Sequence, residues 1–99
     1  MAVETMIQKV FGSKSHIKVV VFLHKLSRAR NKTTMKELER RTGISRVTLV
    51  KIISDLMKAK IVIITGATKG QAIRIMDTPQ KKVVWNFIRD FERSSYMRR

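Results

Sequence analysis

Hydroxyl and basic side chains gather at the start of one short stretch of the chain, residues 45–59. A guanidinium can donate two parallel hydrogen bonds to guanine, and hydroxyl groups can bind base edges or phosphates. Valines stand between these polar residues, where their methyl groups could contact the methyl of thymine. The residues concerned are Ser45, Arg46, Val47, Thr48, Val50 and Lys51. As an alternative, Arg46 and Lys51 belong to a solvated helix face, because basic residues are common on any surface.

The apolar residues of the same stretch predict which side faces outward. They recur at intervals of three and four, which is the spacing of one helical face. These residues are Leu49, Ile52, Ile53 and Leu56. The sequence therefore predicts a helix that Ser45 caps and that ends near Lys60, with its leucine-isoleucine side inward and its basic side exposed.

A second helix is predicted immediately before this one. Thr34 and Glu37 have the spacing of a capping box, in which Thr34 accepts from the Glu37 amide and the Glu37 carboxylate reaches back. The helix runs to about Arg41, and Gly43 breaks it. Residues 42–45 then form a short turn between the two helices.

A β-hairpin is predicted over residues 61–76. Its two runs of β-branched residues, 61–65 and 72–76, are separated by a turn with a glycine at each end. Lys69 and Gln71, at the tip, are expected to approach a phosphate backbone, and a purely structural turn is the alternative.

Three basic residues precede the first of the two helices. Arg28, Arg30 and Lys32 are expected to contact the DNA backbone, and the alternative is that they only keep the surface soluble. The segment that contains Lys32 is long enough for a connection or for a very short strand. Before it, residues 16–28 are apolar on two sides, which predicts a helix at the centre of the core.

The elements follow the order helix, turn, helix, hairpin. In this order, and in the stretch 35–56 with its Gly43-Ile44-Ser45 turn, the chain resembles the winged helix-turn-helix regulators of the MarR and PadR types. Small archaeal and archaeal-virus regulators are similar in size and composition. The resemblance covers about residues 16–76 and implies an α+β, mostly helical fold. Lys60 is a departure, because these families often carry glycine between the reading helix and the first strand of the wing.

Two further helices are expected outside this unit. The chain divides into an N-terminal amphipathic helix over residues 1–12, the winged helix-turn-helix domain over 13–77 and a C-terminal helix over 78–99. Gly12 is expected to end the first by entering the left-handed region, and Thr78-Pro79 to begin the last.

The last helix is longer than a domain of this size needs to cover its core, since about 20 residues reach about 30 Å. We therefore expect both terminal helices to pack against a second chain in a two-fold dimer. The alternative is that they fold back on their own domain. The predicted interface comprises Val3, Met6, Ile7, Val10, Phe11, Val83, Val84, Phe87, Ile88 and Phe91.

The composition points to a polyanionic partner. The net charge is +15, while 43% of the residues are hydrophobic, so the chain should fold and its self-repulsion be offset by a phosphate backbone. An anionic membrane is the weaker alternative. The apolar runs are too short to span a bilayer and cysteine is absent, so we expect a cytoplasmic, nucleoid-associated protein with no disulfide.

Nothing in the sequence supports catalysis. His16 and His24 have no acid or cysteine at metal-ligand spacing, and no phosphate-binding glycine motif occurs. We expect no enzymatic activity, no cofactor and no metal, and we interpret His24 as a buried, hydrogen-bonded histidine.

The leading hypothesis is a dimeric transcription regulator that binds double-stranded DNA at specific sequences, with the helix over 45–59 in the major groove and the hairpin over 61–76 as a wing. Two alternatives remain. One is an architectural protein that coats DNA, which the high charge would favour. The other is a winged-helix adaptor, in plasmid partition or another assembly, that meets a protein partner.

Overall fold

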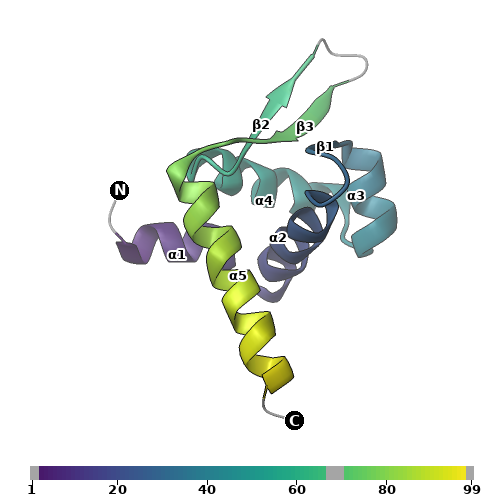
Figure 1. Ribbon diagram of the computed structural model, residues 1–99. Helices are drawn as coiled ribbons and strands as arrows, with labels where there is room; N and C mark the ends of the chain where they lie inside the picture. The colour runs from purple at the N-terminus through teal and green to yellow at the C-terminus, as the bar shows by residue number, and fades with distance from the viewer. Residues whose placement is uncertain (1–2, 67–70, 98–99) are drawn as a thin grey trace.

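The computed structural model describes residues 3–66 and 71–97 and confirms an α+β, mostly helical fold. In chain order the elements are α1 (Val3–Phe11), α2 (Lys14–Leu26), β1 (Lys32–Thr33), α3 (Met35–Thr42), α4 (Arg46–Lys58), β2 (Val62–Thr65), β3 (Ala72–Ile75) and α5 (Pro79–Met97). The hairpin of β2 and β3 projects beyond the helices, and α5 runs away from it toward the opposite end of the molecule (Figure 1). The predicted helix-turn-helix and hairpin are both present.

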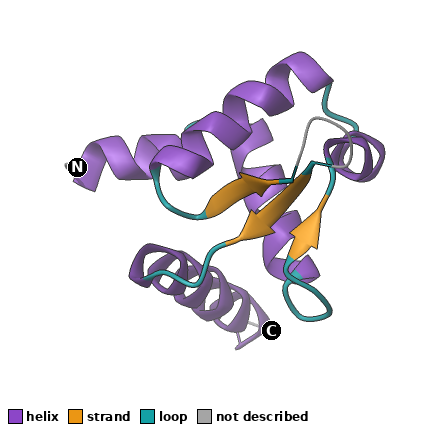
Figure 2. Cartoon of the chain, turned by 90° about the horizontal axis from the view of Figure 1, so that it is seen from above, coloured by secondary structure: helices purple, strands orange, loops and turns teal. Residues whose placement is uncertain are grey.

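The sheet is small and antiparallel, with strand order β1-β3-β2. Figure 2 shows the three strands side by side, with helices around them. β1 adds two residues to the hairpin and sets Thr33 opposite Ile73. Ile73 and Ile75 face the core, whereas Arg74 between them is exposed, so β3 has the alternation of a half-buried strand.

One hydrophobic core joins the helices to the sheet. α2 lies at its centre, as predicted, because Val19, Val20 and Leu23 are fully buried. The stripe of α4 packs against this helix and is also buried in full. These α4 residues are Leu49, Ile52, Ile53 and Leu56. Their burial fixes the rotation of α4 about its axis and therefore decides which of its side chains reach solvent.

Hydroxyl side chains cap α2 and α3, the second at the predicted Thr34. Ser13 Oγ accepts from the His16 amide at 3.2 Å, and Thr34 Oγ1 accepts from the Glu37 amide at 3.1 Å. The second half of the predicted capping box is wrong. The Glu37 carboxylate accepts instead from Oγ1 of Thr33, on the short strand β1, and from Nη2 of Arg30, just before that strand.

The glycines at two helix ends act differently. Gly43 follows α3 with φ of 73°, and its amide donates to the Glu39 carbonyl at 2.9 Å, which is the expected left-handed end of a helix. The prediction for Gly12 is wrong, because its φ is not positive. A side chain is excluded there for another reason, since an added Cβ would lie 2.2 Å from the Gln8 carbonyl oxygen.

Among the described residues, Lys60 is the only non-glycine residue with positive φ, at 62°. Its amide donates to the Met57 carbonyl at 3.0 Å, and the Ile61 amide donates to the Leu56 carbonyl at 2.9 Å. This is the hydrogen-bond pattern of a helix end that favours glycine, which explains why glycine would suit the position. The left-handed conformation of Lys60 costs about 1–2 kcal/mol.

We therefore expect Lys60→Gly to stabilise the protein. Relief of the left-handed strain exceeds the extra chain entropy that glycine adds to the unfolded state, for a net gain of about 0.5–1 kcal/mol. Urea denaturation measures the change in unfolding free energy. Lys51→Gly is the matched control, because Lys51 is an exposed lysine in the interior of α4, where glycine should lower stability by about 1 kcal/mol. A loss of stability in Lys60→Gly would contradict this account of the helix end.

α5 is attached to the domain by one side of its first half. Val84 and Ile88 are buried, and Trp85 Nε1 donates to Ser27 Oγ at 2.9 Å. Trp85 also meets His24 of α2 edge-on, with ring centroids 5.6 Å apart. The alternative that the last helix packs on its own domain is thus correct for this side of α5.

His24 is buried as predicted, but the Nδ1 side of its ring lacks the hydrogen bond expected of a buried histidine. Within the described chain Nδ1 has no hydrogen-bond partner, and Glu92 Oε1 lies 4.0 Å away. Burial lowers the pKa of His24 below its ordinary 6.5, with Arg28 and Arg89 acting in the same direction and Glu92 opposing them. The folded protein therefore favours the neutral imidazole.

This shift predicts that acid destabilises the α2–α5 contact. Below pH 6.5 the unfolded chain binds a proton at His24 more readily than the folded chain does. The contribution of His24 is therefore complete above pH 6.5 and is lost as the pH falls toward the lowered pKa. We expect His24→Phe, which keeps an aromatic ring against Trp85, to reduce the fall in unfolding free energy between about pH 7.5 and about pH 5. If the unfolding free energy falls equally with pH in the wild type and in His24→Phe, a group other than His24 causes the fall.

Candidate nucleic-acid interface

The outward face of α4 and its cap residue Ser45 carry the residues predicted for base or phosphate contact. Ser45, Arg46, Val47, Thr48, Val50 and Lys51 are each exposed. Val47 is 84% exposed and Val50 54% exposed, although β-branched apolar side chains are usually covered. A helix that presents uncovered valines among basic and hydroxyl groups has the mixed surface that a major groove requires.

The first turn of α4 is held by its cap. Ser45 Oγ accepts from the Thr48 amide at 3.5 Å and donates to Thr48 Oγ1 at 3.2 Å. Both hydroxyls are exposed, so they remain accessible to an incoming group. Amide groups of the first turn have no partner within the helix, and together with the helix dipole they attract an anion such as phosphate.

Arg46 does not extend freely into solvent. Its Nε donates to Oε1 of Glu39 on α3 at 2.5 Å, which joins the two helices of the helix-turn-helix across their turn. Sequence reasoning did not identify Glu39. The available signal was an acidic residue in the strongly basic segment that runs from Arg28 to Lys60.

The three basic residues before α3 do not form one set. Arg28 pairs with Glu92 of α5 at 3.7 Å, and Arg30 pairs with Glu37 of α3 at 2.5 Å. Lys32, by contrast, is exposed on β1 directly opposite Arg74 of β3. Packing therefore directs these side chains toward different elements.

Arg74 is a basic residue that the sequence prediction missed. It and Lys32 form a cross-strand pair of like charges, which is unfavourable unless an anion lies near both. Neither side chain has an ion-pair partner within residues 3–66 and 71–94. The alternation of β3 was the signal that could have found Arg74, because it predicts that the middle residue faces solvent.

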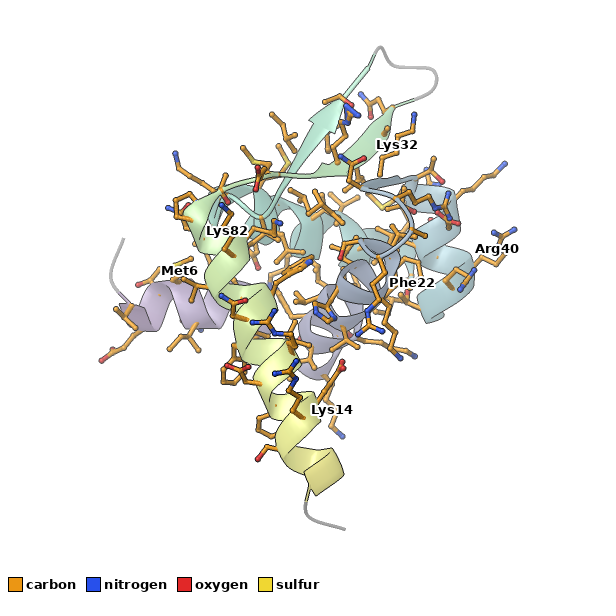
Figure 3. The ribbon with its side chains drawn as sticks, in the orientation of Figure 1. Met6, Lys14, Phe22, Lys32, Arg40 and Lys82 are labelled. Atoms are coloured by element: carbon orange, nitrogen blue, oxygen red, sulfur yellow. The ribbon has the colours of Figure 1, made fainter. Side chains whose placement is uncertain are left out.

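A basic hollow of about 580 Å³ lies between the segment before α3 and the helix itself. It is lined by Arg30, Thr34, Lys36, Glu37 and Arg40. Figure 3 shows Arg40 pointing outward from α3, and Lys32 beside the foot of the hairpin. Hydrogen bonding from Thr33, and then from Arg30, lowers the pKa of Glu37, so the hollow contains one carboxylate among cations. Its net positive charge suits a phosphate group.

The hairpin is placed where a wing would be, beyond the helices (Figure 1). Gln71 is exposed at the start of β3, and Gly66 after β2 has φ of 95°. The predicted contact at Lys69 lies outside the described residues.

His16 joins α2 to α4 through Asp55. Its Nε2 is 2.9 Å from Asp55 Oδ2, and its Nδ1 is 2.7 Å from Ser13 Oγ. Because Ser13 Oγ also caps α2, the contacts of this histidine serve the packing of the two helices. Among the residues that the structure describes, no group of three or more His, Cys, Asp or Glu side chains could hold a metal ion. The same part of the chain contains no helix with the length and apolar composition of a bilayer span.

α1 and α5 border an apolar groove of about 420 Å³. It is lined by Val3, Met6, Ile7, Val10, Phe11, Val83, Val84 and Phe87. Phe11 and Phe87 lie across it with ring centroids 5.7 Å apart, and Phe91 continues the aromatic row at 6.0 Å from Phe87. The terminal helices, distant in sequence, thus share one apolar surface.

The residues predicted for a dimer interface divide into two groups. Val3, Ile7, Val83, Phe87 and Phe91 are exposed, and Met6 and Phe11 are half-buried. Val10, Val84 and Ile88 belong to the core of the chain itself, because they attach the terminal helices to the domain. This corrects the expectation that the whole stripe faces outward.

The short strand β1, the helix-turn-helix of α3 and α4, and the hairpin of β2 and β3 that pairs with β1 follow one another in the order of a winged-helix fold. Comparison with solved structures agrees. The protein AF1382 from Archaeoglobus fulgidus superposes with a TM-score of 0.67 at 16% identity, over 87% of this chain and 92% of that one. A transcriptional regulator homologue from Pyrococcus horikoshii OT3 also superposes with a TM-score of 0.67, at 15% identity, over 92% of this chain and 89% of that one. No protein-family model and no curated protein sequence matches the chain.

Proposed function

We propose that this protein is a dimeric transcription regulator that binds double-stranded DNA at specific sequences. α4 enters the major groove, and the hairpin over residues 61–76 acts as a wing against the backbone. The single observation that carries the proposal is the exposed face of α4, where Val47 stands uncovered between Arg46 and Thr48. Hydrogen-bonding groups and a methyl-bearing side chain on one helical face can distinguish base pairs in the major groove.

Phosphate contacts supply most of the affinity in this proposal. The net charge of +15 favours a polyanion, and Lys32, Arg74 and the basic hollow beside α3 offer cations to two sides of a backbone. Binding should therefore weaken steeply with salt. Arg28 and Arg30 contribute less than their charges suggest, because Glu92 and Glu37 already partly neutralise them.

The apolar groove between α1 and α5 supports the homodimer. A large exposed apolar surface on a soluble domain marks an interface, and Phe87 and Phe91 are each more than half exposed. A two-fold dimer would present two copies of α4 about 34–36 Å apart, so that they reach successive turns of the major groove. In this arrangement residues 13–77 form the DNA-binding domain, and residues 1–12 and 78–99 form the dimerisation part.

The structural comparisons support the regulatory role through the fold. The Pyrococcus horikoshii protein of similar structure is described as a transcriptional regulator homologue. A regulator of this kind acts without catalysis, and its place would be the cytoplasm, at the nucleoid. The lack of catalysis and the location at the nucleoid are proposed on the same basis as DNA binding, which is the fold.

Selection of bound fragments from random duplex DNA tests the proposal. We expect a two-fold symmetric consensus and a preference of about 10³ or more over random duplex. Fragments without a consensus, bound equally well, would overturn the regulator and favour the architectural alternative, for which the high net charge is the specific argument.

A further inference from the structure

The ion pair between Glu39 and Arg46 places a carboxylate beside the exposed face of α4 that carries Arg46 and Lys51. The chain has seven acidic residues against twenty-two basic ones. A negative charge beside the proposed reading face repels phosphates, so its presence there requires a reason.

Stability does not supply this reason. The side chains of Glu39 and Arg46 are 33% and 57% exposed, and solvent screens a pair as open as this one. The core residues of α3 and α4 hold the two helices together without it, because Leu38 and Leu49 are fully buried.

The geometry of the pair gives a different reason. Glu39 Oε1 engages Arg46 Nε, which leaves the N–H groups on Nη1 and Nη2 available. A guanidinium fixed at Nε can present its two terminal nitrogens together to the O6 and N7 acceptors of guanine. Without Glu39, the flexible side chain could turn to any nearby phosphate, a contact that carries no sequence information.

Resting on the function proposed above, we infer that Glu39 is a specificity-determining residue that positions Arg46 for guanine. It acts in two ways. It orients the guanidinium toward the base edge, and its negative charge discourages the use of Arg46 on phosphate in random DNA. Glu39 therefore raises the ratio of specific to random binding without itself contacting a base.

The test is a double-mutant cycle on the selected DNA site and on random duplex. We expect Glu39→Ala to weaken binding to the selected site about tenfold and to strengthen binding to random duplex about threefold. Arg46→Ala should also cost about tenfold or more on the selected site. The double variant should bind that site as Arg46→Ala alone does, because Glu39 acts through Arg46. Losses that multiply in the double variant would overturn the inference.

A base analogue supplies a readout that a structural role would not change. Replacing the preferred guanine with 7-deazaguanine removes the N7 acceptor and should weaken wild-type binding about tenfold, but binding of Glu39→Ala less than threefold. Glu39→Gln, whose amide oxygen can still accept from Nε, should retain the wild-type response. Equal responses of the wild type and Glu39→Ala would overturn the positioning role.

Two controls separate the possible failures. Asp90→Ala removes an acid from α5, where it pairs with the neighbouring Arg89 at 3.9 Å, and should raise binding to both duplexes equally. A specificity loss in Asp90→Ala as large as in Glu39→Ala would reduce Glu39 to a general charge effect. If the wild type binds all DNA sequences equally well, the proposed function fails. If the wild type prefers the selected site but the affinity losses of Glu39→Ala and Arg46→Ala multiply in the double variant, only the inference about Glu39 fails.

Discussion

Val47→Asp is expected to weaken binding to duplex DNA at least about 100-fold. The substitution removes the methyl groups from the most exposed part of the reading face and puts a carboxylate against the phosphates. The new carboxylate also stands four residues before Lys51 on α4, so it can neutralise that cation. Gel shift or fluorescence anisotropy on the selected site measures the loss.

Unfolding cannot explain such a loss. Val47 is 84% exposed and contributes little to the core, and the first turn of α4 contains no acid. An acidic residue in the first turn of a helix is favourable, because it interacts with the positive end of the helix dipole. The variant should therefore melt at least as high as the wild type. Val47→Thr, which keeps one methyl group and the branched shape, should retain most of the affinity.

This variant also separates the remaining alternatives. If DNA binding persists in Val47→Asp while binding of a protein partner is abolished, the exposed face of α4 serves an adaptor. If both selected and random duplexes are bound as tightly as before, α4 does not lie in a groove at all, and the proposed function is wrong.

Phe87→Glu is expected to convert the proposed dimer to monomers. Phe87 lies between Phe11 and Phe91 on the shared surface of α1 and α5, and 56% of it remains exposed in the single chain. A buried, unpaired carboxylate in each half of the interface should raise the dimer dissociation constant at least about 100-fold. Sedimentation should show the mass falling from twice 11.5 kDa to 11.5 kDa.

The control places the same charge one residue away. Asn86 is exposed, does not line the groove and accepts a hydrogen bond from Arg89, so Asn86→Glu should leave the dimer intact. Circular dichroism should show equal helix content for both variants, since Val84 and Ile88 still hold α5 on the domain. A wild-type protein that already sediments as a single chain would refute the dimer.

The helix-turn-helix could be predicted from the sequence because its signals are local. Apolar spacing along α4, the cap at Ser45 and the left-handed turn at Gly43 act within a few residues of one another. These features also predicted which face of α4 is exposed, since only one rotation of the helix buries its leucine-isoleucine stripe.

The terminal helices show what local sequence patterns cannot predict. The pattern predicted the apolar stripe of α5 but could not divide it between two partners. Val84 and Ile88 turn to the core of the chain itself, while Val83 and Phe87 remain uncovered. Neighbouring apolar residues have nearly the same local pattern, and only the docking angle of the helix separates them.

The sequence by itself determined the order of the elements, the outward face of α4 and the excess of positive charge. Only the tertiary structure decided which cations keep a free charge. It set Glu92 beside Arg28, Glu37 beside Arg30 and Glu39 beside Arg46, and it set Lys32 opposite Arg74. The physical reason is the separation in sequence between the residues that interact. Helix periodicity depends on neighbours three and four residues apart, whereas these ion pairs and the cross-strand pair depend on how separate elements pack.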